Sequence, residues 1–300
     1  MSILFTTNTM EINTLRPDEH NFLQRLDNIA DSPKRLCFMG NLPTGDAPVV
    51  AIVGSRKPSS YGREVTEKLA GDLAKAGCVI ISGLALGVDC IAQAAALEAG
   101  GTVVGVVTNE LPEISPRSNQ RLAENIIQKG GAIMSEWKRG DGKIIAKWSF
   151  LERNRLVSGL ADAVVITEAT ARSGTLNTAA HALSQGRELF VVPGNITSPL
   201  SEGCNSLLKQ GAHPVTSARD ILEIIAPASL RSSTSKQISL PVGATPAETA
   251  ILKLLIAGVR DGDQLQQQSG LSASEFATTL TMLEINGIIK PLGANRWTLQ

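Results

Sequence analysis

Glycine, serine and basic residues gather in the short segments that follow four apolar runs of the chain. Residues 54–57 (Gly-Ser-Arg-Lys) follow the first run, and 82–89, 172–175 and 194–205 follow three later ones. Glycine lets the backbone approach an anion, hydroxyl groups add donors, and a helix N-terminus favours negative charge. Phosphate is therefore the ligand that the four segments together suit best, although each one alone is also typical of a helix cap or a tight turn.

A basic stretch with aromatic residues is the second candidate for chemistry. Residues 138–155 carry six Lys and Arg against two acidic residues, and they include Trp148 and Phe150. A cationic groove with a ring on which a base stacks holds single-stranded nucleic acid, at about 1–3 kcal/mol per stacked base. The spacing of Lys147, Phe150 and Arg153 favours one surface for charge and ring. A solvated charged loop with Phe150 in the core explains the same residues equally well.

Fingerprints of catalysis and of cofactor binding are missing from the sequence. No G-x-G-x-x-G follows the first apolar run and no P-loop occurs, which argues against a dehydrogenase or an ATPase. The three histidines lie in different regions and form no triad. We expect no catalytic residue and no cofactor, and we expect Asp89 and Glu168 to orient loops by accepting backbone N–H bonds.

The cysteines and the net charge exclude further classes of protein. Four cysteines show no C-x-x-C pair and no histidine at metal-ligand spacing, so we expect reduced thiols and no metal. The 28 Lys and Arg balance the 28 Asp and Glu, which excludes binding of nucleic acid by a general positive field. No signal sequence and no stretch of about 18 apolar residues is present, so we expect a cytoplasmic protein without membrane contact.

Apolar runs alternate with helical patterns over residues 49–225. The runs lack polar alternation, which indicates strands covered on both faces, and their alternation with helices indicates a mainly parallel sheet. The sequence thus predicts an α/β fold with a Rossmann-like doubly wound sheet. Strands are expected at 49–53, 78–82, 101–107, 132–136, 162–169, 188–194 and 213–217. Residues 1–48 suggest one or two short helices and a connecting segment.

A second, smaller domain is expected after a linker. Residues 226–245 are rich in Pro, Ser, Thr and Gly without periodicity. Residues 246–300 then show two helices, a longer helix after a Ser cap, and two short strands, which is the order of a winged helix. The longest helix, over 272–287, contains no Lys or Arg. Reading of duplex DNA depends largely on such side chains, so the pattern favours protein contact or regulation.

Several of these motifs, taken together and in this order, resemble the DprA/Smf family of DNA-processing proteins. The resemblance covers about 49–225, and the C-terminal unit is similar to the winged helix of many members. Two departures are a missing Gly-rich turn and Tyr-Pro in 108–119, and a missing proline after Ser135-Glu136. The motifs are GSR (54–56), SGLALGVD (82–89), SNQRLAENIIQKGGAIMSE (118–136), FLERNRLVSGLADAVVITEA (150–169), SGTLNTAAHAL (173–183) and VVPGN…GCNSLLKQGA (191–212).

The resemblance implies a homodimer that protects incoming single-stranded DNA in natural transformation and loads the recombinase RecA, without catalytic turnover. It implies that Phe150 is the stacking ring and that Arg56 and Lys147 supply charge, with Arg153 and Asn154 beside them. Ser173, Gly174 and Thr175 would donate to backbone phosphates.

Two other functions remain open at this point. Phosphoribohydrolases share the Rossmann-like fold and resemble P-G-G-x-G-T-x-E-E, but Asn177 and Thr178 stand here where that signature has its carboxylates. A transcription regulator would use the winged helix on duplex DNA, which the uncharged helix disfavours. Release of free base from nucleoside monophosphates would favour the first, and a preference for duplex over single strands would favour the second.

Overall fold

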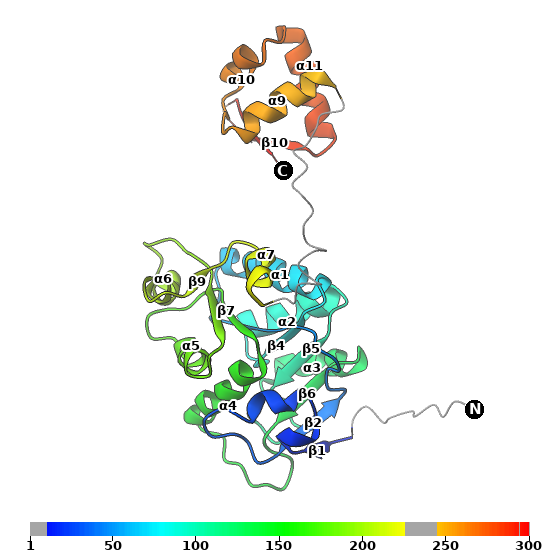
Figure 1. The fold of residues 1–300 in the computed structure, drawn as a ribbon, viewed down its shortest axis with the longest axis vertical. Helices are drawn as coiled ribbons and strands as arrows, with labels where there is room; N and C mark the ends of the chain where they lie inside the picture. Colours follow the sequence, from blue (N-terminus) through cyan, green and yellow to red (C-terminus); the bar gives the residue numbers. More distant parts are fainter. Residues whose placement is uncertain (1–10, 226–244, 294, 300) are drawn as a thin grey trace, which may run out of the picture. The chain divides into compact units, whose positions relative to one another are not determined.

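The computed structural model describes residues 11–225, 245–293 and 295–299, which belong to two compact units (Figure 1). Residues 11–225 lie in the first unit and the remainder in the second. Residues 226–244 of the expected linker lie outside the described residues.

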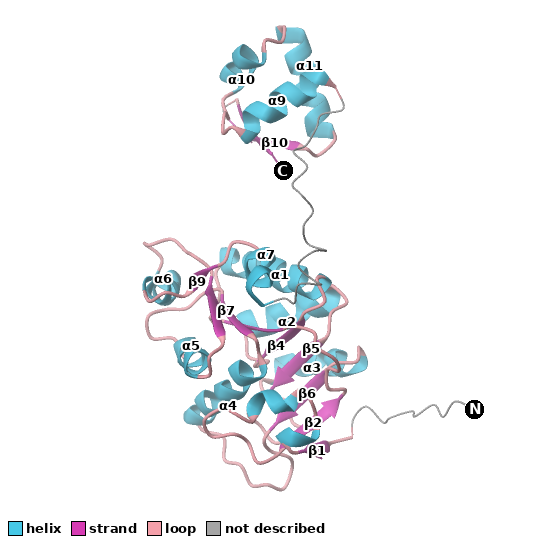
Figure 2. Cartoon of the chain, in the orientation of Figure 1, coloured by secondary structure: helices cyan, strands magenta, loops and turns pink. Residues whose placement is uncertain are grey.

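The first unit is built on a nine-stranded sheet in its described part (Figure 2). The strand order is β1-β2-β6-β5-β4-β3-β7-β8-β9; β1, β2 and β6 pair antiparallel, and all other neighbours pair parallel. The predicted doubly wound, mainly parallel α/β sheet is therefore confirmed. The strands are β1 Asn13–Leu15, β2 Leu36–Gly40, β3 Val49–Val53, β4 Val79–Ser82, β5 Val103–Val106, β6 Ala132–Ser135, β7 Ala163–Ile166, β8 Glu188–Val191 and β9 His213–Pro214.

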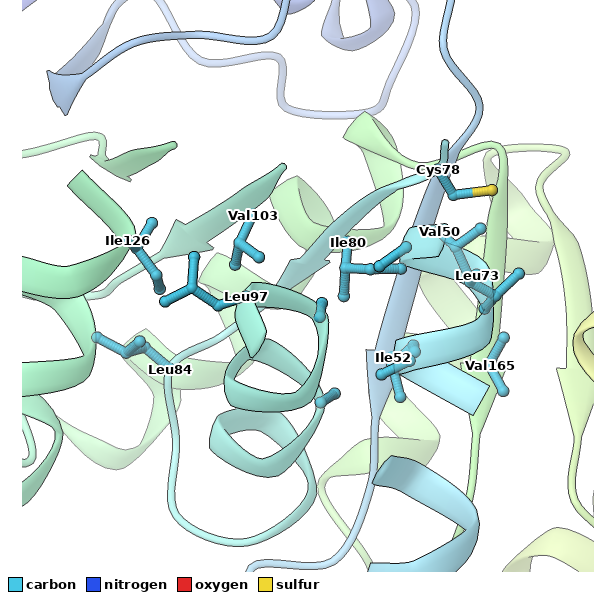
Figure 3. Packing of buried hydrophobic residues seen from close by; sticks show 14 of the residues in the cluster. Val50, Ile52, Leu73, Cys78, Ile80, Leu84, Leu97, Val103, Ile126 and Val165 are labelled. Atoms are coloured by element: carbon cyan, nitrogen blue, oxygen red, sulfur yellow. The ribbon is translucent and has the colours of Figure 1, made fainter. Parts of the chain in front are cut away.

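Helices cover both faces of this sheet, as the unbroken apolar strands require. Alternate residues of β3 face opposite sides: Val50 and Ile52 pack with Leu73 of α1 in one cluster, whereas Ala51 packs with Leu156 of α4 in the other. Figure 3 shows the first cluster. The helices are α1 Ser60–Lys75, α2 Val88–Glu98, α3 Gln120–Gln128, α4 Lys147–Leu160, α5 Thr175–Ser184, α6 Glu202–Lys209 and α7 Ala218–Ile225, with 3-10 helices at Pro17–Glu19, Leu23–Leu26, Arg117–Asn119 and Pro199–Ser201.

The segment before residue 49 differs from the expectation of short helices and a connection. Its described part does contain two 3-10 helices, but it also supplies β1 and β2, and β2 extends the main sheet by pairing with β6. Arg25 forms an ion pair with Asp162, which also accepts the Val49 N–H at 2.8 Å. Sequence periodicity could not show this, because the partners of β2 and of Arg25 lie far along the chain.

The second unit has the element order of a winged helix. Helices α9 Pro246–Ile256, α10 Gly262–Ser269 and α11 Ala273–Ile285 precede the antiparallel strands β10 Ile289–Gly293 and β11 Arg296–Leu299. The hydroxyl of Ser272 accepts the Glu275 N–H at the start of α11, and this confirms the predicted Ser cap. The core comprises Ile251, Leu252, Leu255, Leu265, Phe276, Leu280, Leu283 and Ile289.

Candidate nucleic-acid interface

A pocket of about 460 Å³ lies at the carboxyl ends of β3 and β7, where the order in which strands are added to the sheet reverses. From β3 the strand order runs through β4, β5 and β6 on one side, and β7, β8 and β9 follow on the other. The loops after β3 and β7 therefore separate at the carboxyl edge, where open α/β sheets bind ligands. The lining residues are Val53, Gly54, Arg56, Ala85, Asp89, Phe150, Leu151, Arg153, Asn154, Ser173, Gly174, Thr175 and Thr178.

Seven of the eight residues predicted for the site line this one pocket. Arg56 comes from the loop after β3, Phe150, Arg153 and Asn154 from α4, and 173–175 from the loop that leads into α5. The eighth, Lys147, is the first residue of α4, and its side chain lies outside what the structure describes. Parallel strands bring their carboxyl ends to one edge, which explains how separate segments of the sequence meet here.

Arg56 and Phe150 face each other at the pocket. The guanidinium carbon of the exposed Arg56 lies 5.5 Å from the centre of the Phe150 ring, within cation–π range. The loop that carries Arg56 packs against Gly87, where φ is +80° and a Cβ atom would lie 2.3 Å from the Ser55 carbonyl oxygen. Only glycine permits this approach, and the Val88 N–H then donates to the same oxygen at 3.0 Å.

The hydroxyls of the 173–175 loop bind within the protein. Thr175 donates its hydroxyl to the Gly54 carbonyl at 3.1 Å, and Ser173 donates to the Thr175 hydroxyl oxygen at 3.0 Å. These bonds tie the loop after β7 to the loop after β3. Gly174 is the N-cap of α5, and its N–H has no partner among the residues that the structure describes. The amide of Gly174 is thus the donor that this loop offers to an anion.

Arg153 forms the floor of the pocket. It is 7% exposed, and one of its terminal nitrogens, Nη1, donates to the Val106 carbonyl at 2.5 Å. A Cβ on Gly83 would lie 1.9 Å from that nitrogen, so the glycine makes room for the guanidinium. Its Nε is buried without a partner in the described part of the chain. This burial places most of the Arg153 charge beneath the pocket surface, which the sequence did not show.

Asp89 balances that charge. Burial raises the pKa of the Asp89 carboxyl, and the positive charge of Arg153 and backbone donors oppose the rise. Burial likewise lowers the pKa of Arg153, while Asp89 opposes that shift. A carboxylate oxygen of Asp89 accepts the Gly83 N–H at 3.1 Å, and one of Glu168 accepts the Ser59 N–H at 2.8 Å. The prediction that both acids orient loops is confirmed.

Asn119 is a supporting residue that the sequence analysis missed. Its side-chain amide donates to the carbonyls of Leu84 at 2.9 Å and Ala85 at 3.3 Å, and so it holds the loop after β4 against the pocket. Leu84 has a φ of +55°, an unusual backbone conformation that such bonds help to maintain. The only feature of the sequence that pointed to Asn119 was its position directly before a helical pattern, and an ordinary helix cap has the same position.

The described residues offer neither a metal site nor a membrane-spanning helix. No group of three or more His, Cys, Asp or Glu side chains there is arranged to hold a metal ion. Within the same ranges, no helix is both long and apolar enough to cross a bilayer.

Comparison with known proteins decides the family. A family model described as DNA recombination-mediator protein A matches residues 13–226, and one described as DprA winged helix domain matches residues 236–295. The chain belongs to the DprA/Smf family. The resemblance noted in the sequence is therefore confirmed, and the family match extends over β1 and β2.

Several members of the DprA/Smf family are similar over most of the chain. Protein Smf of Escherichia coli is 38% identical over 273 residues, which cover 86% of this chain and 70% of the relative. DNA processing protein DprA of Streptococcus pneumoniae is 40% identical over 197 residues, which cover 66% and 68%. An X-ray structure of the S. pneumoniae protein superposes with a TM-score of 0.64 at 34% identity and covers 72% of this chain and 75% of that one. A Helicobacter pylori structure, described by its single-stranded DNA binding mode, gives 0.62 at 34% identity and covers 71% and 95%.

Proposed function

We propose that the pocket at the carboxyl edge of the sheet binds single-stranded DNA as a passive ligand. The observation that carries the proposal is the position of the Arg56 guanidinium over the Phe150 ring, in a pocket that also presents the Gly174 amide. The H. pylori relative, described by its single-stranded DNA binding mode, supports the choice of ligand.

Each group in the pocket has a separate part in the proposal. The amide of Gly174 donates to a phosphate oxygen, and Arg56 neutralises phosphate charge and stacks with Phe150. Phe150 offers its ring to a base, and base–aromatic stacking accepts any sequence because every base has a π-face. Lys147 adds charge at the start of α4, and Asn154 offers its amide group. Arg153 acts from beneath, since it binds the carbonyl at the end of β5 and contributes a positive potential.

The proposal is tested by titration of a labelled oligothymidylate at several salt concentrations, with the mass of the complex measured. We expect saturable binding whose logarithmic affinity falls linearly with the logarithm of the salt concentration, because phosphate contacts release counterions. The proposal would be overturned if the duplex form of the oligonucleotide bound with the same affinity as the single strand, or if the single strand did not bind at low salt.

Family membership supports a proposal for the wider role. We infer that the protein acts as a homodimer, presents two such pockets, protects incoming strands in natural transformation, and loads the recombinase RecA. Mixing the DNA complex with RecA should shorten the lag of RecA filament formation on strands covered by a single-strand binding protein. An unchanged lag would contradict the loading role and leave DNA binding untouched.

The proposal includes no catalytic turnover. Asn177 occupies a position where phosphoribohydrolases carry a carboxylate, and its side-chain oxygen accepts a hydrogen bond from Asn154 at 3.3 Å. Position 177 therefore lacks the carboxylate that would accept a proton during hydrolysis. Incubation with nucleoside monophosphates should release no free base, and release at a catalytic rate would revive the enzyme hypothesis.

For the winged-helix unit we propose protein contact. Helix α11 carries no Lys or Arg, and it exposes Met282 and Ile285, which are 46% and 72% exposed. Apolar exposed side chains suit a protein surface better than a phosphate backbone. A gel shift that compares single strands with duplex should show no added duplex affinity from this unit.

A further inference from the structure

Helix α4 separates the pocket from a second, more open hollow of about 780 Å³. Leu151 lines both, so the two sites share one ridge on the first turns of the helix. Phe150 faces the pocket, whereas Trp148 faces the second hollow. The hollow is lined by Asp31, Glu136, Trp137, Lys143, Trp148, Leu151, Glu152, Arg155, Asn177 and His181.

Trp148 is exposed and yet held in place. Trp148 is 53% exposed, which is unusual for tryptophan, the largest of the apolar side chains. The Lys143 ammonium lies 4.7 Å from the centre of the Trp148 ring and 4.6 Å from that of Trp137. Lys143 itself is 12% exposed and pairs with Glu152 at 3.3 Å. One face of the Trp148 indole therefore contacts the paired ammonium of Lys143, and the rest of the ring is exposed to solvent.

The backbone beneath Lys143 is also fixed. The two carboxylate oxygens of Glu110 accept the Lys143 N–H at 2.7 Å and the Gly140 N–H at 3.2 Å. This clamp holds the segment between β6 and α4, where the sequence departs from the family by lacking a proline. An exposed ring that is already ordered loses little conformational entropy when a partner stacks on it.

The charges in the second hollow suit a base and not a phosphate. Three carboxylates, those of Asp31, Glu136 and Glu152, outnumber the cations Lys143 and Arg155. Arg155 is paired with both oxygens of Glu136, at 2.7 and 3.1 Å, and Lys143 is paired with Glu152. Burial and the nearby charge of Arg155 lower the pKa of His181, so its ring is neutral near pH 7. A negatively charged phosphate would gain no net electrostatic attraction in this hollow, whereas a neutral base can stack on the exposed indole of Trp148.

We propose that Trp148 is a second base-stacking position, which takes a base of the same DNA strand after the strand passes from the Phe150 pocket over Leu151. The ligand is the neutral heteroaromatic base, and the phosphates of that nucleotide stay on the side of Arg56. This inference rests on the proposed function, because it extends the strand that the pocket binds.

The test uses the full chain and an oligothymidylate long enough to leave the pocket. In a Trp137→Phe, Trp297→Phe background Trp148 is the single tryptophan, and DNA should quench its fluorescence as the complex saturates. Trp148→Leu, which keeps an apolar side chain but removes the ring, should weaken binding about fivefold or more. Trp148→Phe should restore most of that loss. The dependence of affinity on salt should stay unchanged in both variants, since no phosphate contact is removed.

The outcomes separate the two proposals. No quenching of Trp148, together with full affinity in Trp148→Leu and a clear loss in Phe150→Ala, would overturn the second stacking position and leave the pocket intact. Full affinity in Trp148→Leu, Phe150→Ala and Arg56→Ala alike would overturn the proposed function itself. Equal losses in Trp148→Leu and Trp148→Phe would also overturn the stacking role, because a retained ring must retain stacking. Circular dichroism of each variant establishes that it is folded.

Discussion

The Arg56 guanidinium carbon lies 5.5 Å from the centre of the Phe150 ring, although Arg56 belongs to the loop after β3 and Phe150 to α4. Arg56 is exposed and has no ion-pair partner in the part of the chain that the structure describes. A cation that no carboxylate neutralises, and that lies over a ring, can meet a phosphate and a base together.

Replacement of Arg56 should weaken DNA binding through charge. Arg56→Ala is expected to lower affinity for all sequences alike and to reduce the slope of log affinity against log salt by about 0.7, the value for one phosphate contact on a single strand. We expect the same for Lys147→Ala. Fluorescence anisotropy at four salt concentrations measures both quantities.

A matched control for these two variants is Lys75→Ala. Lys75 ends α1, close to the start of β4 and hence at the opposite edge of the sheet from the pocket. Its removal should leave the slope unchanged. A slope that falls equally in Lys75→Ala would mean that general charge, and not the pocket, drives binding.

Replacement of Phe150 should weaken binding through stacking. Phe150→Ala is expected to cost about 1–3 kcal/mol of binding free energy with little change in the salt slope. Phe150→Tyr keeps the ring and should bind nearly as well as the wild type. The prediction fails if Phe150→Ala reduces the salt slope as much as Arg56→Ala does.

Removal of Arg153 should destabilise the fold. Asp89 is 7% exposed, and Arg153→Ala would remove the charge that opposes the effect of burial on its carboxyl, together with the bond that Arg153 donates to the Val106 carbonyl, at a cost of about 1–3 kcal/mol in the free energy of unfolding. Urea unfolding followed by circular dichroism measures the loss. The double variant Asp89→Ala, Arg153→Ala should lose less than the sum of the single variants, and strict additivity would show that the two side chains do not interact.

Asp89 should also make stability depend on pH. Its pKa in the folded state is raised from the ordinary value of 3.8, because burial disfavours the charged form. As pH rises above that value the unfolded state releases its proton first, so wild type should lose stability relative to Asp89→Asn until the folded pKa is passed. The difference changes by at most about 1.4 kcal/mol per pH unit. Urea unfolding of both proteins across this range measures the difference, and the assignment is contradicted if the free energy of unfolding falls no more steeply with rising pH in wild type than in Asp89→Asn.

The cysteines should differ in reactivity. Burial, and secondarily the charge of Asp162, raises the pKa of Cys78 to about 12, and burial raises that of Cys204 to about 11, so neither forms the reactive thiolate near pH 8. Cys90 is partly exposed. Mass spectrometry after brief alkylation should show Cys90 modified first, with Cys78 and Cys204 modified only in urea. Equal rates for Cys78 and Cys90 in the native protein would show that Cys78 is accessible.

The amino-acid sequence by itself determined the seven strands β3 to β9 of the α/β unit and the candidates for the pocket, but not β1 and β2. Short apolar runs such as 49–53, bounded by turn residues, favour strands that are covered on both faces, and the Gly- and Ser-containing segments after them favour turns and helix starts. Both are local properties, which neighbouring residues set. The strand-end loops suggested Arg56 and Gly174 as neighbours, and the resemblance to the DprA/Smf family added Phe150 to them.

The tertiary structure alone decided which of these groups face solvent and what surrounds them. Arg153 lies beneath the pocket because Gly83, far away in the sequence, leaves space for its guanidinium. Trp148 is placed by Lys143, whose ammonium lies against its ring and also contacts Trp137 and Glu152. Strand β2 joins the sheet because β6 presents an unpaired edge. Burial and pairing depend on contacts between distant residues, and no local pattern of side chains encodes them.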